Sequence, residues 1–541
     1  MRAFRECRVA PAIRARHDKE EVMQARLLLG AVAAASIVVT TPALADAQSD
    51  LKAQVEALQK QLDILKTQLD QVTADMNKQK EAAQHEAKSG GPFLQRKPGD
   101  AVTFLTPGGG ELTLYGNLDV SFDYTTKGLK GDYGDNGGVP VGKMGWQPAI
   151  GSNLSYLGAR GRHPLKPDLD FIWQLEAGID IAATPGTKQT TSNISDTVNG
   201  ALFSRNSFVG FSGRDWGAAM IGKSETPYKT STDRLNPFSG MLGDYRVMIG
   251  NTGGDNRVEF GLRASHAIWY ESPSWTGASF KAMYSPGQNR DDTSSIVPSS
   301  EPDCAGGNIP GSGALPPTCN DGSFGDLYSV SAQYLKGPLY LTAAYELHRN
   351  VNRTSDLGNL DPRDIGDESA VKVGAQYTFA TRTTVSALWE RTHRDLPSDL
   401  EFQNERSRPN ATWLALTQVL TDKDNVSFGW GHAAKSKGFL GVHNTPDDQT
   451  SFDNAANLYS VAWRHLLDKS TTFYADWAMT VNHADAHYDL GAGGHGVTTD
   501  CHDSTPLAAF DPTTGGVTNT GPHCFSGGKV QGISVGVDYR F

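Results

Sequence analysis

Apolar and polar residues alternate with a period of two from Glu111 to the end of the chain. In the first stretch the two sets occupy opposite faces: Leu112, Leu114, Gly116, Leu118, Val120, Phe122 and Tyr124 against Thr113, Tyr115, Asn117, Asp119, Ser121 and Asp123. The alternation recurs near residues 171–180, 371–379 and 473–479. Successive side chains of a strand point to opposite faces, so each stretch predicts a strand with one apolar face and one polar face. Only Asn410 to Leu420 is ambiguous, because the neighbours Trp413 and Leu414 are both apolar.

The segments between these strands alternate between short and long. Tight turns are expected near residues 164–167, 213–217, 272–276, 336–338, 380–383, 421–425 and 467–470. Long polar segments lie near residues 125–152, 183–202, 224–262, 286–325, 349–367, 394–409, 435–453 and 483–528. About sixteen strands result, and short periplasmic turns with long external loops are typical of outer-membrane barrels.

These two patterns together predict the fold class of residues 111–541. We expect an all-β transmembrane β-barrel of about sixteen antiparallel strands, in which closure leaves no unpaired sheet edge in the lipid. A pair of soluble β-sandwiches is the alternative. It would explain neither the aromatic apolar faces nor the asymmetry in loop length.

A different period, close to 3.5 residues, governs residues 46–88. Apolar residues at alternating spacings of four and three form one narrow seam: Leu51, Val55, Leu58, Leu62, Leu65, Leu69, Val72 and Met76. A lone helix would leave the apolar side chains of this seam exposed to water, so we expect a short α-helical coiled coil. A single helix lying on another surface is the alternative. Residues 89–110, which contain Gly108, Gly109 and Gly110, are expected to form a flexible linker.

The N-terminus has the features of an export signal. Leu27 to Val39 is apolar, Arg26 precedes it, and Ala43-Leu44-Ala45 offers the small residues that a signal peptidase recognises. We expect residues 1–45 to be a leader, with Met23 as the true start. Removing the leader deletes seven basic and four acidic residues, so the formal net charge falls from -11 to -14. So acidic a chain argues against nucleic acid as a partner.

Cysteine usage agrees with export. Cys7 leaves with the leader, and the rest form two local pairs within predicted external loops, Cys304 with Cys319 and Cys501 with Cys524. An even count in an exported chain favours these disulfides, although spacing alone does not fix the connectivity. The last loop also holds His483, His487, His495, His502 and His523. With reduced thiols this loop would suit zinc or copper, but a disulfide with surface histidines is preferred, so no metal is expected.

Two short segments match enzyme motifs by chance. Gly532 to Gly536 spells the nucleophile elbow, but it lies inside an alternating strand with no helix after it. Gly491 to Gly496 spells a dinucleotide fingerprint without the strand, turn and helix that it requires. No nucleophile, base and orienting group form a convincing set, so neither an enzyme nor a cofactor is expected.

Several segments resemble the general diffusion porins of proteobacterial outer membranes. They are Ser204 to Gly213, Thr226-Pro227-Tyr228, Leu235 to Phe238, Tyr270 to Gly277, and the ending Gly532 to Phe541. The resemblance spans roughly Glu111 to Phe541. It implies a homotrimer of sixteen-stranded barrels with the third long loop folded into each lumen, and a terminal Phe541 that the barrel assembly machinery recognises. The coiled coil is not part of the core family pattern.

The resemblance also implies a pore constriction, in which arginines on the barrel wall face carboxylates on the third loop. Carried over position by position, the basic candidates are Arg205, Arg160 and Arg263, and another basic wall position falls on Tyr156. The acidic candidates on or beside the loop are Glu225, Asp233, Asp244 and Asp255. Any single one of these charges could instead be a solvated loop residue. From the acidic chain and Tyr156 we expect a weak cation preference.

The predicted function is a water-filled outer-membrane channel for passive diffusion of small polar solutes and ions, with its coiled coil in the periplasm. The alternative is a barrel that acts mainly as an anchor, with the coiled coil as an envelope tether or adhesin. Expected partners are a second and third copy of the chain, outer-membrane lipids, the barrel assembly machinery and, for a tether, peptidoglycan.

Overall fold

The computed structural model of the chain forms two compact units, Met1–Gly91 and Pro92–Phe541. It describes residues 102–126, 146–179, 181, 205–251, 260–286, 324–352, 365–395, 409–436, 453–483 and 528–541, with the short pieces 59–60, 63, 66, 95–96, 486, 488, 490, 508–510 and 517–519. In the first unit Gln59, Lys60, Asp63 and Lys66 are helical and exposed. Among the described residues, no helix is both long enough and apolar enough to cross a bilayer.

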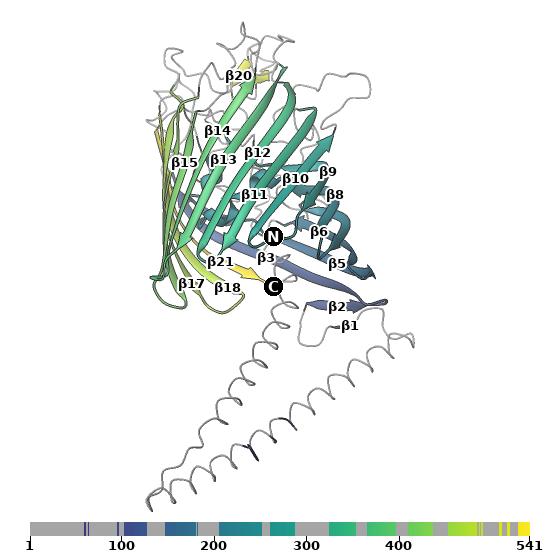
Figure 1. Cartoon of the computed structure of the whole chain (residues 1–541). Helices are drawn as coiled ribbons and strands as arrows, with labels where there is room; N and C mark the ends of the chain where they lie inside the picture. The colour runs from purple at the N-terminus through teal and green to yellow at the C-terminus, as the bar shows by residue number, and fades with distance from the viewer. Residues whose placement is uncertain are drawn as a thin grey trace, which may run out of the picture. The chain divides into compact units, whose positions relative to one another are not determined.

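One antiparallel sheet fills the second unit and curves into a barrel (Figure 1). Its strands are β1 (Gln95–Arg96), β2 (Thr103–Thr106), β3 (Gly110–Thr125), β4 (Gln147–Ser152), β5 (Tyr156–Lys166), β6 (Leu169–Gly178), β7 (Ser207–Gly213), β8 (Gly217–Glu225), β9 (Arg263–Glu271), β10 (Ala278–Pro286), β11 (Asp326–Lys336), β12 (Leu339–Asn352), β13 (Ile365–Thr378), β14 (Thr383–Asp395), β15 (Ala411–Val419), β16 (Asp424–Ala433), β17 (Ala456–Leu466), β18 (Thr471–Asn482) and β21 (Gly528–Arg540).

The barrel is closed, because its last strand pairs with its first. β21 pairs with β18 on one side and with β3 on the other. β4 and β5 both pair with β3 along different parts of its length, so they act as one interrupted strand. Setting β1 and β2 aside, the 19 strands of the sheet therefore give the predicted sixteen barrel strands.

Because apolar and polar residues alternate along the sequence, each strand has an apolar outer face and a polar inner face. On β3, Phe122 and Tyr124 are exposed on the outside, whereas Ser121 and Asp123 are buried on the inside. On β13, Val371 and Val373 are outside and Lys372 is inside. The predicted alternation is confirmed, with apolar side chains outside and polar ones inside.

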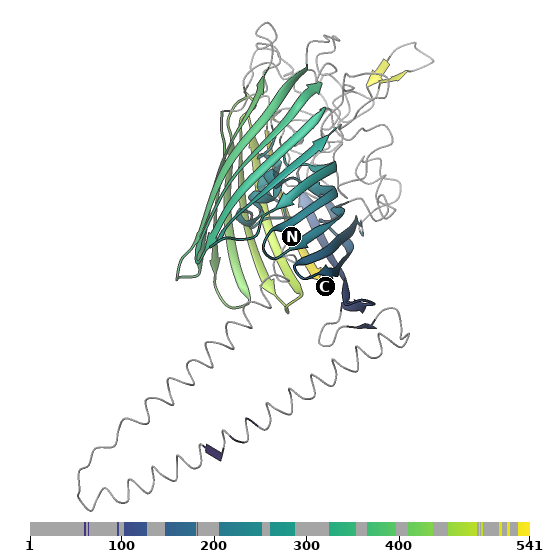
Figure 2. The same ribbon diagram turned by 45° about the vertical axis from the view of Figure 1, so that its right-hand side comes forward.

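The predicted alternation of short and long connections is confirmed too. For example, only two residues join β11 to β12, whereas 37 residues separate β8 from β9. We call the two rims the short-turn end and the long-loop end. In the last long segment, β19 (Ala508–Phe510) and β20 (Val517–Asn519) form a separate hairpin that projects beyond the long-loop end (Figure 2).

Residues 89–110 were predicted to form a flexible linker. In the structure, part of this range belongs to the barrel sheet. β2 pairs with the start of β3 and β1 pairs with β2. Gly108 and Gly109, expected to be flexible, form the tight turn between β2 and β3 with φ values of 82° and 81°. Glycine adopts this left-handed conformation without a steric penalty, so the glycine run closes a hairpin here.

The ambiguous strand is resolved by its packing inside the barrel. Trp413 is fully buried on the inner face of β15, and Leu414 is exposed on the outer face. A Cβ atom on Gly429 of β16 would lie 2.2 Å from the Trp413 ring, so the glycine leaves room for the indole. The inner face accepts an apolar ring at this position because the third long loop covers it.

Several sequence predictions fall outside the described residues. These are the coiled-coil seam, the four cysteines, Asp255, and all last-loop histidines except His483, which lies 2.9 Å from Asp453. Gly532 to Gly536 does lie within strand β21, as expected from its alternation.

Candidate pore constriction

The described part of the third long loop, residues 226–251 and 260–262, folds into the barrel lumen. It begins with the short helix α3 (Pro227–Ser231) and continues through the 3-10 turns η2 (Asp233–Leu235) and η3 (Tyr245–Val247). Thr226 caps α3 by accepting a hydrogen bond from the Lys229 N–H, and Pro227 occupies the first helical turn, where its missing N–H costs nothing. Apolar loop residues are buried in one cluster with inner-wall side chains: Leu235, Phe238, Met241, Leu242, Tyr245, Val247, Met248 and Ile249.

Hydrogen bonds hold this loop to the wall formed by β12 to β15. The Trp413 Nε1 donates to the Leu235 carbonyl at 3.1 Å, and the Tyr340 hydroxyl donates to the Ser231 carbonyl at 2.6 Å. The Lys372 Nζ donates to the Thr232 Oγ1 at 2.9 Å. Each contact satisfies a polar loop group inside the barrel, which is required because buried unpaired groups are costly.

Glu390 of β14 is a central anchor of the loop. Its carboxylate is fully buried and accepts hydrogen bonds from the Tyr228 hydroxyl and, at 2.8 Å, from the Gly250 N–H. These two donors lie near opposite ends of the loop. Glu390 therefore ties its beginning and its later part to the same strand.

The loop also reaches the wall formed by β17 and β18. The Ser460 hydroxyl donates to the Gly243 carbonyl at 3.0 Å, and the Gly243 N–H donates to the Leu490 carbonyl at 2.8 Å. Leu490 and Tyr488, at the root of the last long segment, are buried in the same cluster. The third loop is thus fixed at several points, as the resemblance to porins implied.

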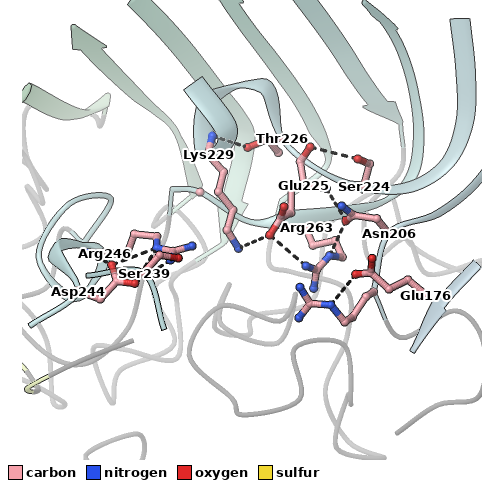
Figure 3. A network of polar contacts seen from close by, with 12 residues as sticks. Glu176, Asn206, Ser224, Glu225, Thr226, Lys229, Ser239, Asp244, Arg246 and Arg263 are labelled. Carbon is pink, nitrogen blue, oxygen red and sulfur yellow. Dashed lines mark hydrogen bonds and ion pairs between the residues drawn. The ribbon is translucent and has the colours of Figure 1, made fainter. Parts of the chain in front are cut away.

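On the opposite wall, arginines lie beside carboxylates, as Figure 3 shows. The Arg205 Nε donates to Glu176 Oε1 at 2.6 Å, and the Tyr115 hydroxyl donates to Glu176 Oε2 at 3.0 Å. The Arg205 guanidinium lies 4.8 Å from the centre of the Tyr156 ring. Tyr156, which stands at an expected basic position, therefore supports an arginine instead of adding a charge.

Glu225 is the second carboxylate of this network and binds two bases. The Arg263 Nη2 lies 3.0 Å and the Lys229 Nζ 3.3 Å from Glu225 Oε1. The Arg263 Nε also donates to the Asn206 side-chain oxygen at 2.8 Å. Lys229 was missed by the sequence analysis, although its position four residues after Glu225 is the spacing that brings side chains together on a helix.

The third carboxylate, Asp244, is fully buried within the loop itself. It caps η3, accepts a hydrogen bond from Asn236 at 2.7 Å, and pairs with the Arg246 Nη2 at 2.7 Å. In Figure 3, Asp244, Arg246 and Ser239 form a group separate from the Glu225 group. Asp244 therefore stabilises the loop, while the partly exposed Arg246 presents the charge.

The remaining candidates occupy different environments. Asp233 is exposed on η2, next to the exposed Arg234. Although Asp233 faces the lumen, the surrounding protein reduces its hydration and raises its pKa to about 6. Arg160, on β5, lies 5.3 Å from the centre of the Tyr115 ring.

Arg205 lies just before strand β7 and not within it. If Arg205 belonged to the following strand, Val209 and Phe211 would have to face inward with it. The structure begins β7 at Ser207, and Val209 and Phe211 are exposed on the outer face, at 46% and 47%. Because Arg205 precedes the strand, the direction of its side chain does not depend on the inward and outward alternation along β7.

The C-terminal Phe541 completes the ladder between β21 and β3. Its N–H donates to the Gly116 carbonyl at 3.2 Å, and its carbonyl accepts from the Gly116 N–H at 3.1 Å. Its ring stacks on Tyr539 with the centroids 5.7 Å apart. The last residue is thus part of the closing seam of the barrel.

The chain is similar to several known outer-membrane proteins. Major outer membrane protein P.IB of Neisseria sicca is 27% identical over 135 residues, which are 25% of this chain and 32% of that protein. The match thus spans about a third of the relative. An anion-selective porin from Comamonas acidovorans is 18% identical, with 80% of this chain and 100% of that chain covered and a TM-score of 0.49. The outer membrane channel DcaP of Acinetobacter baumannii is 12% identical, with 82% and 100% covered and a TM-score of 0.46.

A family model described as Gram-negative porin matches residues 31–485. This range is well over half of the 541 residues and includes the third loop and every barrel strand up to β18. The chain therefore belongs to the Gram-negative porin family.

Proposed function

We propose that this protein is an outer-membrane channel for the passive diffusion of small polar solutes and ions. The observation that carries the proposal is the third loop, which is pinned inside a closed barrel next to a network of paired charges. A barrel of sixteen strands is wide enough to hold an aqueous lumen. A loop folded inside narrows that lumen, so that only small solutes can pass. The family and the polar inner faces of the strands support the same function.

Selection in such a pore is by size and by polarity. A solute that enters the constriction must exchange part of its hydration shell for the charged and hydroxyl groups of the wall and loop. Small polar solutes can make this exchange, whereas apolar solutes would displace water from the charged groups without replacing its hydrogen bonds. The function needs no catalytic group, and the fold and family point to a channel instead of an enzyme.

The proposal is tested by reconstitution of the purified protein. In planar bilayers we expect stepwise increases in conductance in KCl, and in liposomes we expect permeation of monosaccharides to exceed that of trisaccharides. Protein unfolded before reconstitution serves as the control. Folded barrels that give no conductance steps and no sugar permeation would contradict the proposed channel.

We also propose that the channel assembles as a homotrimer, with residues 46–88 as a periplasmic coiled coil. The support is the heptad seam, which self-association would bury, together with the family resemblance. Leu62→Asp would place a charge in the seam, and Gln59→Asp would place one at an exposed helical position. We expect Leu62→Asp alone to weaken the trimer in native mass spectrometry. An unchanged trimer would restrict the assembly interface to the barrel.

The tether remains the second candidate, and no comparison favours it. Incubation of the full chain with purified peptidoglycan would separate the two functions. Sedimentation of the protein with peptidoglycan would show that tethering is an added role, and a protein that stays in the supernatant would exclude it.

A further inference from the structure

Three adjacent strands at the closing seam of the barrel carry a row of oxygen-bearing side chains on their inner faces. β21 lies between β3 and β18 (Figure 1), and its Ser534 is paired with Asp123 of β3 on one side and with Asp476 of β18 on the other. Ser534 and Asp123 are 0% exposed and Asp476 is 4% exposed. Two carboxylates and a hydroxyl therefore share one level of the inner wall, shielded from the lumen water. We call these three residues the seam row.

The hydroxyl groups in and beside the seam row lack a hydrogen-bond partner among the residues that the structure describes. This holds for Ser534 Oγ, at the centre of the row, although its side chain is fully buried. It also holds for Thr125 Oγ1, one inner position beyond Asp123 on β3, where the residue is 1% exposed. Buried polar groups without a partner are costly and call for an explanation. Their place beside two carboxylates points to a ligand that binds oxygen atoms.

Side chains cover the seam row on both sides along the strands. Toward the short-turn end, the Tyr474 ring lies over Gly536, where an added Cβ atom would be 2.3 Å from the ring. Toward the long-loop end, Leu242 of the third loop and Leu490 lie over Gly532, at 3.1 Å and 2.9 Å from an added Cβ atom. The two glycines are the inner-face neighbours of the row on β21, and they leave room for these covers.

One base of the described residues interacts with the seam row from its flank. Arg464 of β17 interacts electrostatically with Asp476 and with Asp119, a further buried aspartate on β3. Its pairing partner is Tyr474, so it stands on the far side of β18 and one level closer to the short-turn end than Asp476. Its guanidinium contacts the third loop. The contacts of the arginine therefore lie away from the space over Ser534.

We propose that the seam row binds one divalent cation, with the chemistry of calcium, between Asp123 and Asp476 over Ser534. Calcium is bound by oxygen ligands, among them carboxylates, at about 2.3–2.6 Å. Every side chain of the row offers oxygen, whereas zinc and copper favour imidazole and thiolate. Among the described residues, no group of three or more histidine, cysteine, aspartate or glutamate side chains is arranged for a metal. The row is thus a site of two carboxylates that neutral oxygens complete.

A cation at this position acts on the closure of the barrel. It brings positive charge between two buried carboxylates, whose charged forms are costly to bury. It also links β3 to β18 across β21, the last strand of the barrel. Calcium therefore stabilises the folded barrel. The inference goes beyond the proposed channel function and does not depend on conduction.

The experiment measures calcium binding and stability of the folded, full-length protein in detergent after treatment with EGTA. In equilibrium dialysis the protein should bind calcium. The urea midpoint of unfolding should rise with calcium concentration, because a ligand that binds only the folded state stabilises it. A protein that binds no calcium, with a urea midpoint that calcium leaves unchanged, would overturn the site without any variant.

Two variants assign the binding to the seam row. Asp123→Asn and Asp476→Asn each keep the shape of the side chain and remove one charge. Each should lose one bound ion per chain at calcium concentrations that just saturate the wild type. We expect binding at this site to weaken at least about tenfold, since even a residue that only orients a metal ligand contributes about 10–100-fold to the affinity. In EGTA both variants should be at least as stable as the wild type, because one of two like charges is gone.

A matched control removes an aspartate charge elsewhere. The side chain of Asp422, at a short turn, is 95% exposed, so Asp422→Asn should bind calcium as the wild type does. Ser534→Ala should weaken binding less than either seam-row aspartate variant, because it removes a neutral oxygen. Equal calcium binding by Asp123→Asn, Asp476→Asn and Asp422→Asn would assign the bound ions to other carboxylates and would overturn the proposed site.

Discussion

At the scale of single residues, the constriction depends on buried polar groups that hold a loop in place. Glu390, Lys372 and Trp413 each bind a different part of the third loop. Their side chains face a lumen that elsewhere contains water, so the loop is what removes them from solvent. These residues fix the loop inside the barrel, and we expect them to control the width of the pore without lining the path of the solute.

The clearest test of this anchoring is Glu390→Ala. The change leaves the Tyr228 hydroxyl and the Gly250 N–H without their acceptor, which costs about 1–3 kcal/mol for each buried group that stays unpaired. We expect a looser loop, visible as larger current fluctuations in the open single channel. Arg391→Ala on the outer face of the same strand is the control. Equal current noise in the two variants would contradict the anchoring role of Glu390.

We expect Asp233 to give the constriction a dependence on pH. Its pKa is raised to about 6, mainly because the surrounding protein reduces its hydration, while Arg246, Lys229 and Lys372 oppose the shift. Below pH 6 the carboxyl becomes neutral, so a negative charge disappears from the lumen. We expect the chloride-to-potassium permeability ratio to rise as the pH falls from 7 to 5. In Asp233→Asn the ratio should be constant over this range, and an unchanged pH response in that variant would exclude Asp233 as its source.

At the scale of elements, each strand separates lipid from water by its alternation. Val373 is 44% exposed on the outer face of β13, and its neighbour Lys372 is buried on the inner face beneath the third loop. A charge is tolerated on one face and excluded from the other. The strand can therefore be tested by placing the same new charge on either side of the wall.

Val373→Arg should destabilise the folded barrel by about 2–4 kcal/mol, the cost of an arginine on the lipid face near the middle of a bilayer. Thr417→Arg on β15 places the same side chain on the inner face, where water is available, and should cost much less. Urea unfolding in lipid vesicles measures the difference. Equal losses of stability would contradict the assignment of the two faces.

At the scale of the whole molecule, closure of the barrel depends on the seam between β21 and β3. Phe541 forms the last backbone pairs of this seam with Gly116. Its ring fills the space over Gly116, where an added Cβ atom would lie 2.6 Å from the Phe541 Cζ. β2 then continues the pairing along β3 beyond the C-terminus.

We expect Phe541→Ala to lower the amount of barrel assembled in the outer membrane, because the variant removes the predicted assembly signal and the packing over Gly116. Heat-modifiable migration of membrane fractions in gel electrophoresis would report the folded fraction. Phe379→Ala, an exposed aromatic residue at a short turn, is the control. Normal assembly of Phe541→Ala in cells would remove the assembly role, and unchanged refolding in detergent would separate recognition from packing.

The sequence alone determined the strands, their faces and the lengths of their connections, because the two-residue period and the turn residues are local properties of the chain. It also located the third loop and candidates such as Arg205, Arg263 and Glu225. Only the tertiary structure decided which side of the ambiguous strand faces inward, that β1 and β2 join the sheet, and which charges are paired. Trp413 lies inside because a loop more than 150 residues earlier covers it, and Arg205 pairs with Glu176 of strand β6. Such long-range contacts have no local signature, since they form only when the closed barrel brings distant segments together.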